Sequence, residues 1–487
     1  MAKDNNQATL TEEQINAVAE LYNSGKFSET IAKIKALNED YPNVPLLFNI
    51  LGACYQAQGL LEDSAQMFET ATKIKPDYAE AYFNLGVVFK ADEKLDEAIE
   101  SYKKAIYLVP NYAAAHNNLG NIYKDINQID DAMKSYESAI AIKPDYFEAH
   151  HNLSTVKKFT KGDNQIEQIK SHLLDNELDV QSQIYLYFTM AKIYEDLGDQ
   201  KQQCNFLKEG SKLKKQQASY NPDQSFKLLS SLKVLFQAQN PITDNPSYEV
   251  SKKHPIFIIG MPCSGMSLLE QIITNHNDVD TLGESKILSK LVPPIINNKS
   301  TEKLVSKQMF LSIRENYFGY LESLSKPQSF ITDRMPGNFR YVGFIISAFP
   351  EAKIVHVKRD ARETCWLIYK RLFSDIGYSW SYSFDDLVKY YSFYSKLMSF
   401  WSELYPSQIY DINLEDLIIN QEEETRNLLE YCELDWDKNC LTWNSYKGES
   451  ETLSSEKLPE MMYKFDSATW KNYEPHIKPL ITGLESI

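Results

Sequence analysis

Cysteine is scarce in this sequence of 487 residues, and the few cysteines present show no pattern of pairing. They have neither the close spacing of a disulfide framework nor the paired spacing of a zinc site. We therefore expect reduced thiols in a cytoplasmic protein with no metal site. The six cysteines are Cys54, Cys204, Cys263, Cys365, Cys432 and Cys440.

Long apolar runs and an excess of positive charge are also missing. No run is long enough to span a bilayer, and the opening residues, MAKDNNQATLTEEQ, do not resemble a secretory leader. Lys and Arg total 51 against 67 Asp and Glu, a net charge of −16, which disfavours binding to nucleic acid or anionic membranes. The length and a hydrophobic content of 43% predict two or three globular domains.

A period of 34 residues runs through the first third of the chain. Small residues recur where two helices would cross, aromatic residues recur between them, and proline closes each unit. This is the tetratricopeptide pattern, and it predicts an α-solenoid over residues 1–158 with a concave face for a protein or peptide. The repeating columns are Gly52, Gly86 and Gly120; Tyr55, Phe89 and Tyr123; Phe68, Tyr102 and Tyr136; Ala71, Ala105 and Ala139; and Pro76, Pro110 and Pro144.

Two further regions follow the repeats. Residues 159–250 are helical in pattern but lose the period, and 183–198 resembles the first helix of a degenerate repeat. From residue 251 onward, short apolar strands at 256–259 and 353–357 and a third strand candidate at 408–412 alternate with helical patterns. This alternation predicts a doubly wound α/β domain over residues 251–487.

The stretch from His254 to Asn275, HPIFIIGMPCSGMSLLEQIITN, reads as a strand, a tight loop and a helix start. Unpaired backbone N–H groups and the helix dipole make such a loop a cradle for an anion. The spacing of Gly260, Gly265 and Ser267 nearly fits a nucleotide P-loop. Met266 stands where that motif needs Lys, which disfavours an ATPase, a GTPase or a P-loop kinase. A strand-to-helix turn of any α/β domain is the plain alternative.

The same stretch resembles the 5′-phosphosulfate loop of bacterial tetratricopeptide-repeat sulfotransferases, which are related to tyrosylprotein sulfotransferases. That family reads roughly PIFIVGMPRSGTTLLEQIL, with Arg and Thr at the places of Cys263 and Met266 here. The resemblance implies a P-loop-like α/β sulfotransferase domain that uses 3′-phosphoadenosine-5′-phosphosulfate (PAPS) and no metal. The residues it implies for the loop around the donor are Pro262, Cys263, Ser264, Gly265, Met266, Ser267 and Leu268.

A second stretch, AKIVHVKRDARETC, resembles the family's 3′-phosphate motif. The resemblance implies that Arg359 grips the 3′-phosphate as a planar bidentate donor. Arg371 matches a further phosphate-binding Arg of the tyrosylprotein branch. Leu367 replaces the family's Ser and cannot donate a hydrogen bond. The alternative is a surface Arg pair in a helix cap with Asp360.

Two more matches supply candidate catalytic residues. The resemblance implies that Glu284, in TLGE, is the base that accepts the hydroxyl proton of the acceptor. DRMPGNF resembles DKMPxNF, so Arg334 takes the place of a Lys that stabilises the leaving group. A solvated Glu284 and a structural pair between Arg334 and Asp333 are the plain alternatives.

The C-terminal stretch also follows the family without a gap and places Ser454 at the donor. Five expected anion ligands are replaced, so two hypotheses remain. The first is an enzyme that moves a sulfuryl group from PAPS to an acceptor hydroxyl, on a protein or peptide delivered by the repeats. The second is a non-catalytic scaffold that binds a protein partner through its repeats. The replaced positions are Cys263, Met266, Leu367, Pro459 and Thr469.

Overall fold

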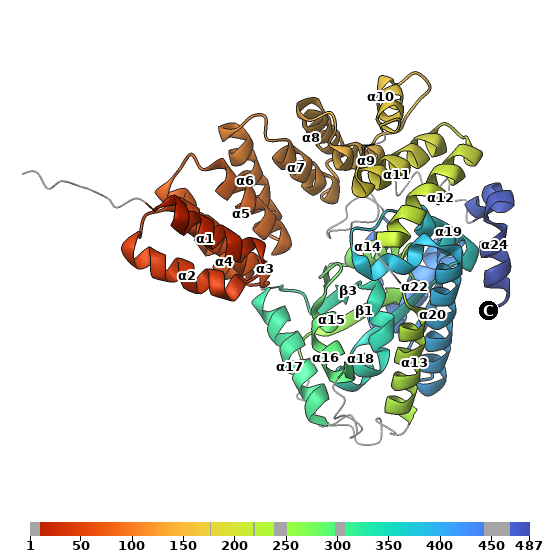
Figure 1. Cartoon of the computed structure of the whole chain (residues 1–487). Helices are drawn as coiled ribbons and strands as arrows, with labels where there is room; N and C mark the ends of the chain where they lie inside the picture. Colours follow the sequence, from red (N-terminus) through yellow and green to blue (C-terminus); the bar gives the residue numbers. More distant parts are fainter. Residues whose placement is uncertain are drawn as a thin grey trace, which may run out of the picture. The chain divides into compact units, whose positions relative to one another are not determined.

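The computed structural model describes residues 10–175, 177–217, 220–237, 251–297, 307–324, 326–442 and 468–487. The chain divides into two compact units, Met1–Lys158 and Phe159–Ile487. Figure 1 shows the helices of the first unit and the mixed helices and strands of the second. None of the described helices combines the length and the apolar character that crossing a bilayer requires.

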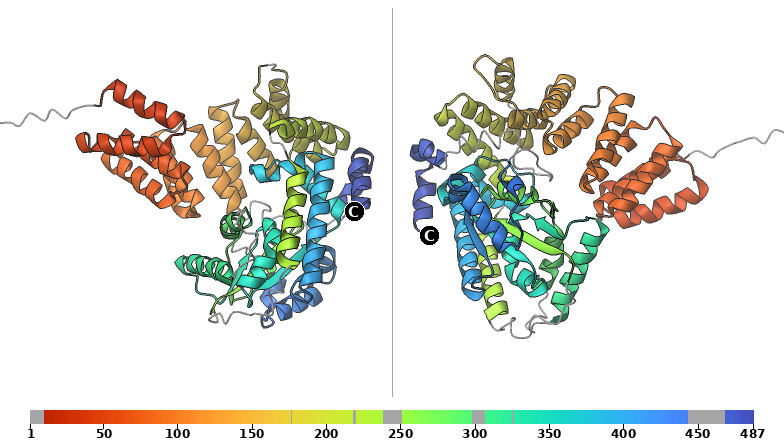
Figure 2. Two further views of the ribbon diagram at one scale, coloured as in Figure 1. Left: turned by 60° about the horizontal axis from the view of Figure 1, so that its bottom comes forward. Right: turned by 180° about the vertical axis from the view of Figure 1, so that it is seen from behind.

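The first unit is a run of paired helices, as the repeat period predicts, and the tetratricopeptide α-solenoid is confirmed. Consecutive helices pack in pairs, and each pair packs on the next (Figure 2). The helices are α1 Glu12–Asn23, α2 Phe27–Asp40, α3 Pro45–Ala57, α4 Leu61–Ile74, α5 Ala79–Ala91, α6 Leu95–Leu108, α7 Ala113–Asp125, α8 Ile129–Ile142 and α9 Phe147–Val156.

The glycine and aromatic columns meet inside each repeat. A Cβ added at Gly86 would lie 2.6 Å from the Tyr102 ring, and one at Gly120 would lie 2.7 Å from the Tyr136 ring. Both tyrosines are fully buried. The 34-residue spacing therefore records a contact: the glycine leaves the space that the aromatic ring of the next helix fills.

The second unit begins with helices α10 Asn164–His172, α11 Val180–Asp196, α12 Gln200–Gln217 and α13 Pro222–Gln237. Helices α11 and α12 pack as a pair, and a Cβ at Gly210 would lie 3.0 Å from the Phe188 ring. This is again a glycine facing an aromatic ring. Helix α13 lies along α20, Phe384–Leu404, although they are far apart in the sequence (Figure 1).

Five parallel strands form one sheet in the order β2-β3-β1-β4-β5, so the predicted doubly wound α/β fold is confirmed. The three predicted strands are present as β1, β4 and β5. Two very short strands, β2 and β3, were not predicted. The strands are β1 His254–Gly260, β2 Val279–Thr281, β3 Phe330–Asp333, β4 Lys353–Lys358 and β5 Tyr410–Asn413.

Alternating side chains of β1 pack into two separate hydrophobic cores on opposite faces of the sheet. Ile256 and Ile258 pack with helix α14 and the short helix α21, whereas Phe257 and Ile259 pack on the opposite face, which α18 and α20 help to cover. Because both faces are covered, β1 is apolar without a break from Pro255 to Ile259. The remaining elements are α14 Met266–Thr274, α15 Ile287–Leu291, α16 Pro293–Asn297, α17 Lys307–Ser323, η1 Pro336–Tyr341, α18 Val342–Ala348, α19 Ala361–Tyr369, η2 Ile376–Tyr382, α21 Leu414–Ile419, α22 Gln421–Tyr431, η3 Lys438–Leu441, η4 Thr469–Tyr473 and α24 Glu474–Glu485.

The sheet order sets where a ligand can enter. After β1 the chain crosses towards β2 and β3, whereas after β4 it continues to β5 on the other side. The loops that follow β1 and β4 therefore diverge at the carboxyl ends of two neighbouring strands. In open α/β sheets this is the position of the ligand crevice.

Candidate active site

The loop between β1 and α14 can be built only with glycine at two places. Gly265 has φ +101°, and a Cβ there would lie 2.6 Å from the Leu414 side chain. A Cβ at Gly260 would lie 2.8 Å from the carbonyl oxygen of Val357. The loop therefore turns tightly against its neighbours and delivers the start of α14, where backbone N–H groups lack intrahelical partners.

Ser264 is the polar side chain buried within this loop. It is 1% exposed, and its hydroxyl has no hydrogen-bond partner among the residues that the structure describes. Leaving a buried hydroxyl unpaired costs about 1–3 kcal/mol, so this atom fits a site that receives an acceptor or donor from a ligand. Cys263, beside it, is half-buried with φ +64°.

Four further predicted loop residues are buried. Their side chains give a ligand fewer hydrogen-bond donors than the family pattern does. Met266 and Leu268 pack into the core beneath the loop. Met266 therefore occupies the place of a Thr with an apolar side chain that serves the fold. The buried members of this group are Pro262, Met266, Ser267 and Leu268.

Arg359, directly after β4, joins the two loops at the crevice. Its Nη1 donates a hydrogen bond of 3.0 Å to the carbonyl oxygen of Cys263, and its Nη2 lies 3.7 Å from Oε1 of Glu363. Glu363 is buried and accepts hydrogen bonds from Thr469 Oγ1 at 2.6 Å and from the Trp470 backbone N–H at 2.9 Å. One guanidinium thus links the loop after β1 to a carboxylate that holds the C-terminal segment.

A cavity of about 590 Å³ opens beside these loops. A second buried hydroxyl, that of Thr364, also faces this space without a partner among the described residues. Two unpartnered hydroxyls and two cations fit a polar, anionic ligand, although three carboxylates also reach the wall. The lining residues are Met261, Ser264, His356, Val357, Lys358, Arg359, Asp360, Thr364, Tyr391, Tyr394, Ser395, Met398, Ser399, Ser402, Asp411, Asn413 and Glu415.

His356 forms a hydrogen-bonded chain in this cavity that the sequence analysis missed. Its Nδ1 lies 2.7 Å from Oδ1 of Asp411, and its Nε2 lies 2.5 Å from the hydroxyl of Tyr394. Burial lowers the pKa of His356, in spite of the hydrogen bond to Asp411, so the imidazole is neutral near pH 7. A histidine among the apolar residues of the segment 354–357 was the available signal.

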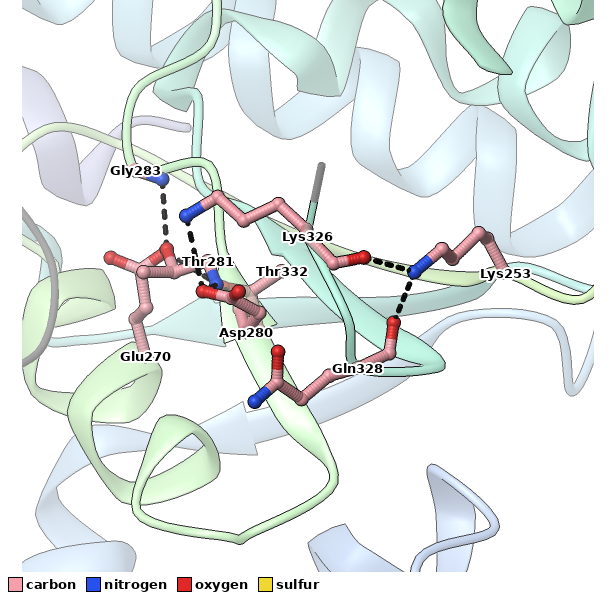
Figure 3. A network of polar contacts seen from close by, with 8 residues as sticks. All are labelled: Lys253, Glu270, Asp280, Thr281, Gly283, Lys326, Gln328 and Thr332. Atoms are coloured by element: carbon pink, nitrogen blue, oxygen red, sulfur yellow. Dashed lines mark hydrogen bonds and ion pairs between the residues drawn. The ribbon is translucent and has the colours of Figure 1, made fainter. Parts of the chain in front are cut away.

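The two predicted catalytic residues meet directly. Arg334 follows β3, is 1% exposed, and places Nη1 2.6 Å from Oε1 of Glu284. Its Nε donates over 2.7 Å to Glu270, which comes from α14. Figure 3 shows Glu270 beside the hydroxyls of Thr281 and Thr332. Sequence reasoning missed Glu270, although an acid inside an otherwise buried helix was a signal.

Asp333 occupies a separate buried pocket next to Arg334. It accepts hydrogen bonds of 3.1 Å from the Tyr317 hydroxyl and from the Asn338 side-chain amide. Burial raises the pKa of Asp333 to about 8, because desolvation and the charge of Glu270 together outweigh both hydrogen bonds and the nearby Arg334. Asp333 is therefore largely protonated at neutral pH.

Arg371, a predicted ligand of PAPS, is not among the residues that line the cavity. Arg371 follows the carboxyl end of α19, whereas Arg359 precedes its amino end, so the nine residues of the helix separate them by about 13 Å. The backbone N–H of Arg371 donates to Ile368. Ser454 and Pro459 lie outside the described residues. The described residues contain no group of three His, Cys, Asp or Glu side chains placed to hold a metal ion.

Comparisons with known proteins agree with this architecture. Residues 255–438 match the model of the sulfotransferase family, and residues 52–93, 89–126 and 120–156 match the TPR repeat. An uncharacterized protein of Aquifex aeolicus is 26% identical over 66% of this chain and 44% of its own length. Protein-tyrosine sulfotransferase 1 of Danio rerio is 22% identical over 48% of this chain and 68% of its own.

The match to the Aquifex protein thus leaves more than half of that relative unaligned. Among solved structures, the crystal structure of MamA is similar, with 21% identity, a TM-score of 0.29, and coverage of 39% of this chain and 97% of MamA.

Proposed function

Because residues 255–438 form a sulfotransferase-family domain, we propose that this protein moves a sulfuryl group from PAPS to an acceptor hydroxyl. The observation that carries the proposal is the hydrogen bond of 3.0 Å between Arg359 and the Cys263 carbonyl. It joins the candidate 5′-phosphosulfate loop to the candidate 3′-phosphate ligand at the ligand crevice of the sheet.

The donor would lie across these two loops. The N–H groups at the start of α14 and the unpartnered hydroxyl of Ser264 would hold the 5′-phosphosulfate. Arg359 would pair with the 3′-phosphate through a planar, charged head. A hydrophobic core side chain at Met266 and the contact of Thr469 with Glu363 leave fewer donors than the family pattern has.

The reaction needs one proton acceptor and an oriented leaving group. The acceptor oxygen attacks sulfur in line as the bond from sulfur to the phosphate oxygen breaks, and 3′-phosphoadenosine-5′-phosphate (PAP) departs. Glu284 takes the hydroxyl proton, and its side chain is 26% exposed, so an acceptor can reach it. The backbone N–H groups of α14 stabilise the charge on the departing phosphate.

The acceptor is proposed to be a tyrosyl hydroxyl in a protein or peptide. The support is the similarity to protein-tyrosine sulfotransferases, together with repeats that suit a polypeptide partner. An acceptor from a sugar or a lipid is an outcome that the same assay can show.

A second candidate function is a scaffold that keeps the fold and binds a partner through its repeats. It is favoured by the structural use of two replaced ligand positions: Met266 fills the core, and Thr469 binds Glu363. On this alternative, the donor crevice has no catalytic role.

Two experiments separate the two candidate functions. The first is calorimetry with PAP, and the second measures transfer of a radiolabelled sulfuryl group from PAPS to a tyrosine peptide, a monosaccharide and 4-nitrophenol. The enzyme should bind PAP at micromolar concentration and label an acceptor. Glu284→Ala should abolish labelling but keep PAP binding. Glu315→Ala, at an exposed position on α17, is the control. No PAP binding at millimolar concentration would support the scaffold.

A further inference from the structure

Glu270 is a fully buried carboxylate in the middle of the helix that opens the candidate donor site. It is 0% exposed, and its neighbours on α14, Leu269 and Ile272, belong to the apolar core. Burying a charged carboxylate costs several kcal/mol unless charge pairing and hydrogen bonds offset it. An acid at this position therefore needs a set of partners, and the fold provides one.

Both oxygens of Glu270 are engaged. Oε2 accepts the Nε–H of Arg334 at 2.7 Å, and Oε1 accepts the hydroxyls of Thr281 at 2.8 Å and Thr332 at 3.0 Å. Thr281 and Thr332 come from the neighbouring strands β2 and β3. Three elements thus converge on one carboxylate, as Figure 3 shows for Glu270 and the two threonines.

The same contacts fix the backbone that carries Glu284. The Gly283 N–H donates to Thr281 Oγ1 over 2.8 Å, and the Gly283 carbonyl accepts the backbone N–H of Arg334 over 2.8 Å. Gly283 has φ +60°, a backbone conformation that glycine adopts readily. Glu284 follows it directly, so its position depends on Thr281 and Arg334.

Arg334 therefore stands between two carboxylates. Its Nε is directed to Glu270 and its Nη1 to Glu284. The sequence resemblance implies that this cation acts on the leaving oxygen. The geometry instead directs these two donors at acids, and Glu284 is the member of the trio whose side chain reaches solvent.

We propose that Glu270 is a positioning residue for sulfuryl transfer: it holds Arg334 so that Arg334 fixes the Glu284 carboxylate towards the acceptor. This inference rests on the proposed function, because it takes Glu284 to be the base. Arg334 then acts through Glu284 and not on the leaving phosphate. The charge of Arg334 is shared with Glu270, so Glu284 is oriented without carrying the whole ion pair.

Other ionisable groups surround the trio, and none of them replaces Glu270. Asp333 is protonated near neutral pH because burial raises its pKa to about 8. Asp280 pairs with Lys326 at 3.2 Å. Burial raises the pKa of the Tyr378 phenol, and the charge of the nearby Glu284 raises it further.

The first test is steady-state kinetics of Glu270→Gln, which keeps the shape and removes the charge. Turnover per PAP-binding site should fall about 10- to 100-fold, the scale expected for a misplaced catalytic group. The KM for PAPS and the Kd for PAP should stay within twofold, because Glu270 has no place in the donor contacts. Glu270→Asp, which restores the charge, should recover part of the turnover. Glu422→Gln, exposed on α22, is the control.

A second test needs no transfer activity. In thermal unfolding, the Tm of the double variant Glu270→Gln with Glu284→Gln should fall by more than the sum of the falls in the two single variants. The reason is that only the double variant leaves Arg334 buried without either carboxylate. Additive losses would overturn the shared contact. Unchanged turnover in Glu270→Gln would overturn the positioning role. Super-additive unfolding in a protein that never transfers sulfuryl would retain the trio and remove its catalytic purpose, together with the proposed function.

Discussion

Arg359 and Cys263 are 96 residues apart in the chain, and the Nη1 of the arginine donates to the carbonyl oxygen of the cysteine over 3.0 Å. This bond brings together the loops after two neighbouring strands. It also restrains Cys263 in the left-handed region of backbone conformation, at φ +64°.

Replacing Arg359 should weaken PAP binding. Arg359→Ala should raise the Kd about 10- to 100-fold, because a charge-assisted hydrogen bond contributes about 1.5–3 kcal/mol. The Kd of Arg359→Lys should lie between those of the original protein and Arg359→Ala, since an ammonium keeps the charge but not the planar pair of donors. Isothermal calorimetry is the measurement, with Arg426→Ala on the exposed side of α22 as control. Equal affinity in Arg359→Ala and the control would remove Arg359 from the donor site.

Restoring a cation to the loop should strengthen PAP binding. Cys263 is half-buried, so a longer side chain can leave the loop without entering the core. Cys263→Arg should lower the Kd about tenfold, and the gain should shrink as salt is added. Cys263→Gly is the matched control, because it suits the positive φ without adding charge. If both variants bind PAP equally, the missing Arg is not what limits affinity.

Asp333 should make stability depend on pH. Its pKa in the folded protein is raised to about 8 by burial, above the usual value of 3.8, so the folded state binds the proton more tightly than the unfolded state. This stabilising contribution is complete below about pH 4 and is lost as the pH rises through 8. The free energy of unfolding of Asp333→Asn should therefore rise relative to that of the original protein as the pH increases. The relative gain from pH 5 to pH 8 should be on the order of 3 kcal/mol.

Urea unfolding at several pH values measures this difference. An Asn side chain at position 333 can still form one hydrogen bond as acceptor and one as donor with the neighbouring Tyr317 and Asn338 side chains. The packing around this position should therefore be kept. A stability difference that stays constant from pH 5 to 8 would show that Asp333 titrates normally.

A methyl group at Gly86 should destabilise the repeat unit. The added Cβ would lie 2.6 Å from the buried Tyr102 ring, and overpacking of this kind costs about 1–3 kcal/mol. Gly319→Ala on α17 is the matched control: nothing lies within 4 Å of its added Cβ, so the change should stabilise by roughly 0.5–1 kcal/mol. Calorimetric unfolding measures both. Gly86→Ala combined with Tyr102→Leu should recover part of the loss, and an unaltered Tm in Gly86→Ala would contradict the packing.

Much of the fold was predictable from local patterns. The 34-residue columns predicted paired helices because each glycine and aromatic residue meets the same neighbour in every repeat, as Gly86 and Tyr102 do. Strands β1 and β4 were visible as apolar runs, and β5 was visible as a strand candidate. Strands β2 and β3 were not, because three and four residues are too few for a pattern, and their pairing with β1 and each other defines them.

The candidate site was only partly predictable. The loop from Gly260 and Arg359 could be recognised from motif and resemblance, and the structure places them in contact. Glu270, His356 and Asp411 were missed, since a single polar residue in an apolar helix or strand has no spacing that reveals its partner. Their roles depend on side chains from other strands and helices.

By itself, the sequence determined the repeat solenoid, the alternating α/β domain and the tight loop after β1, because these depend on periodicity and on residues close in the chain. Only the tertiary structure decided which acids surround Arg334 and which side chains have become part of the core. Burial and ion pairing join residues up to 64 positions apart at that cluster, and no local pattern records such distances.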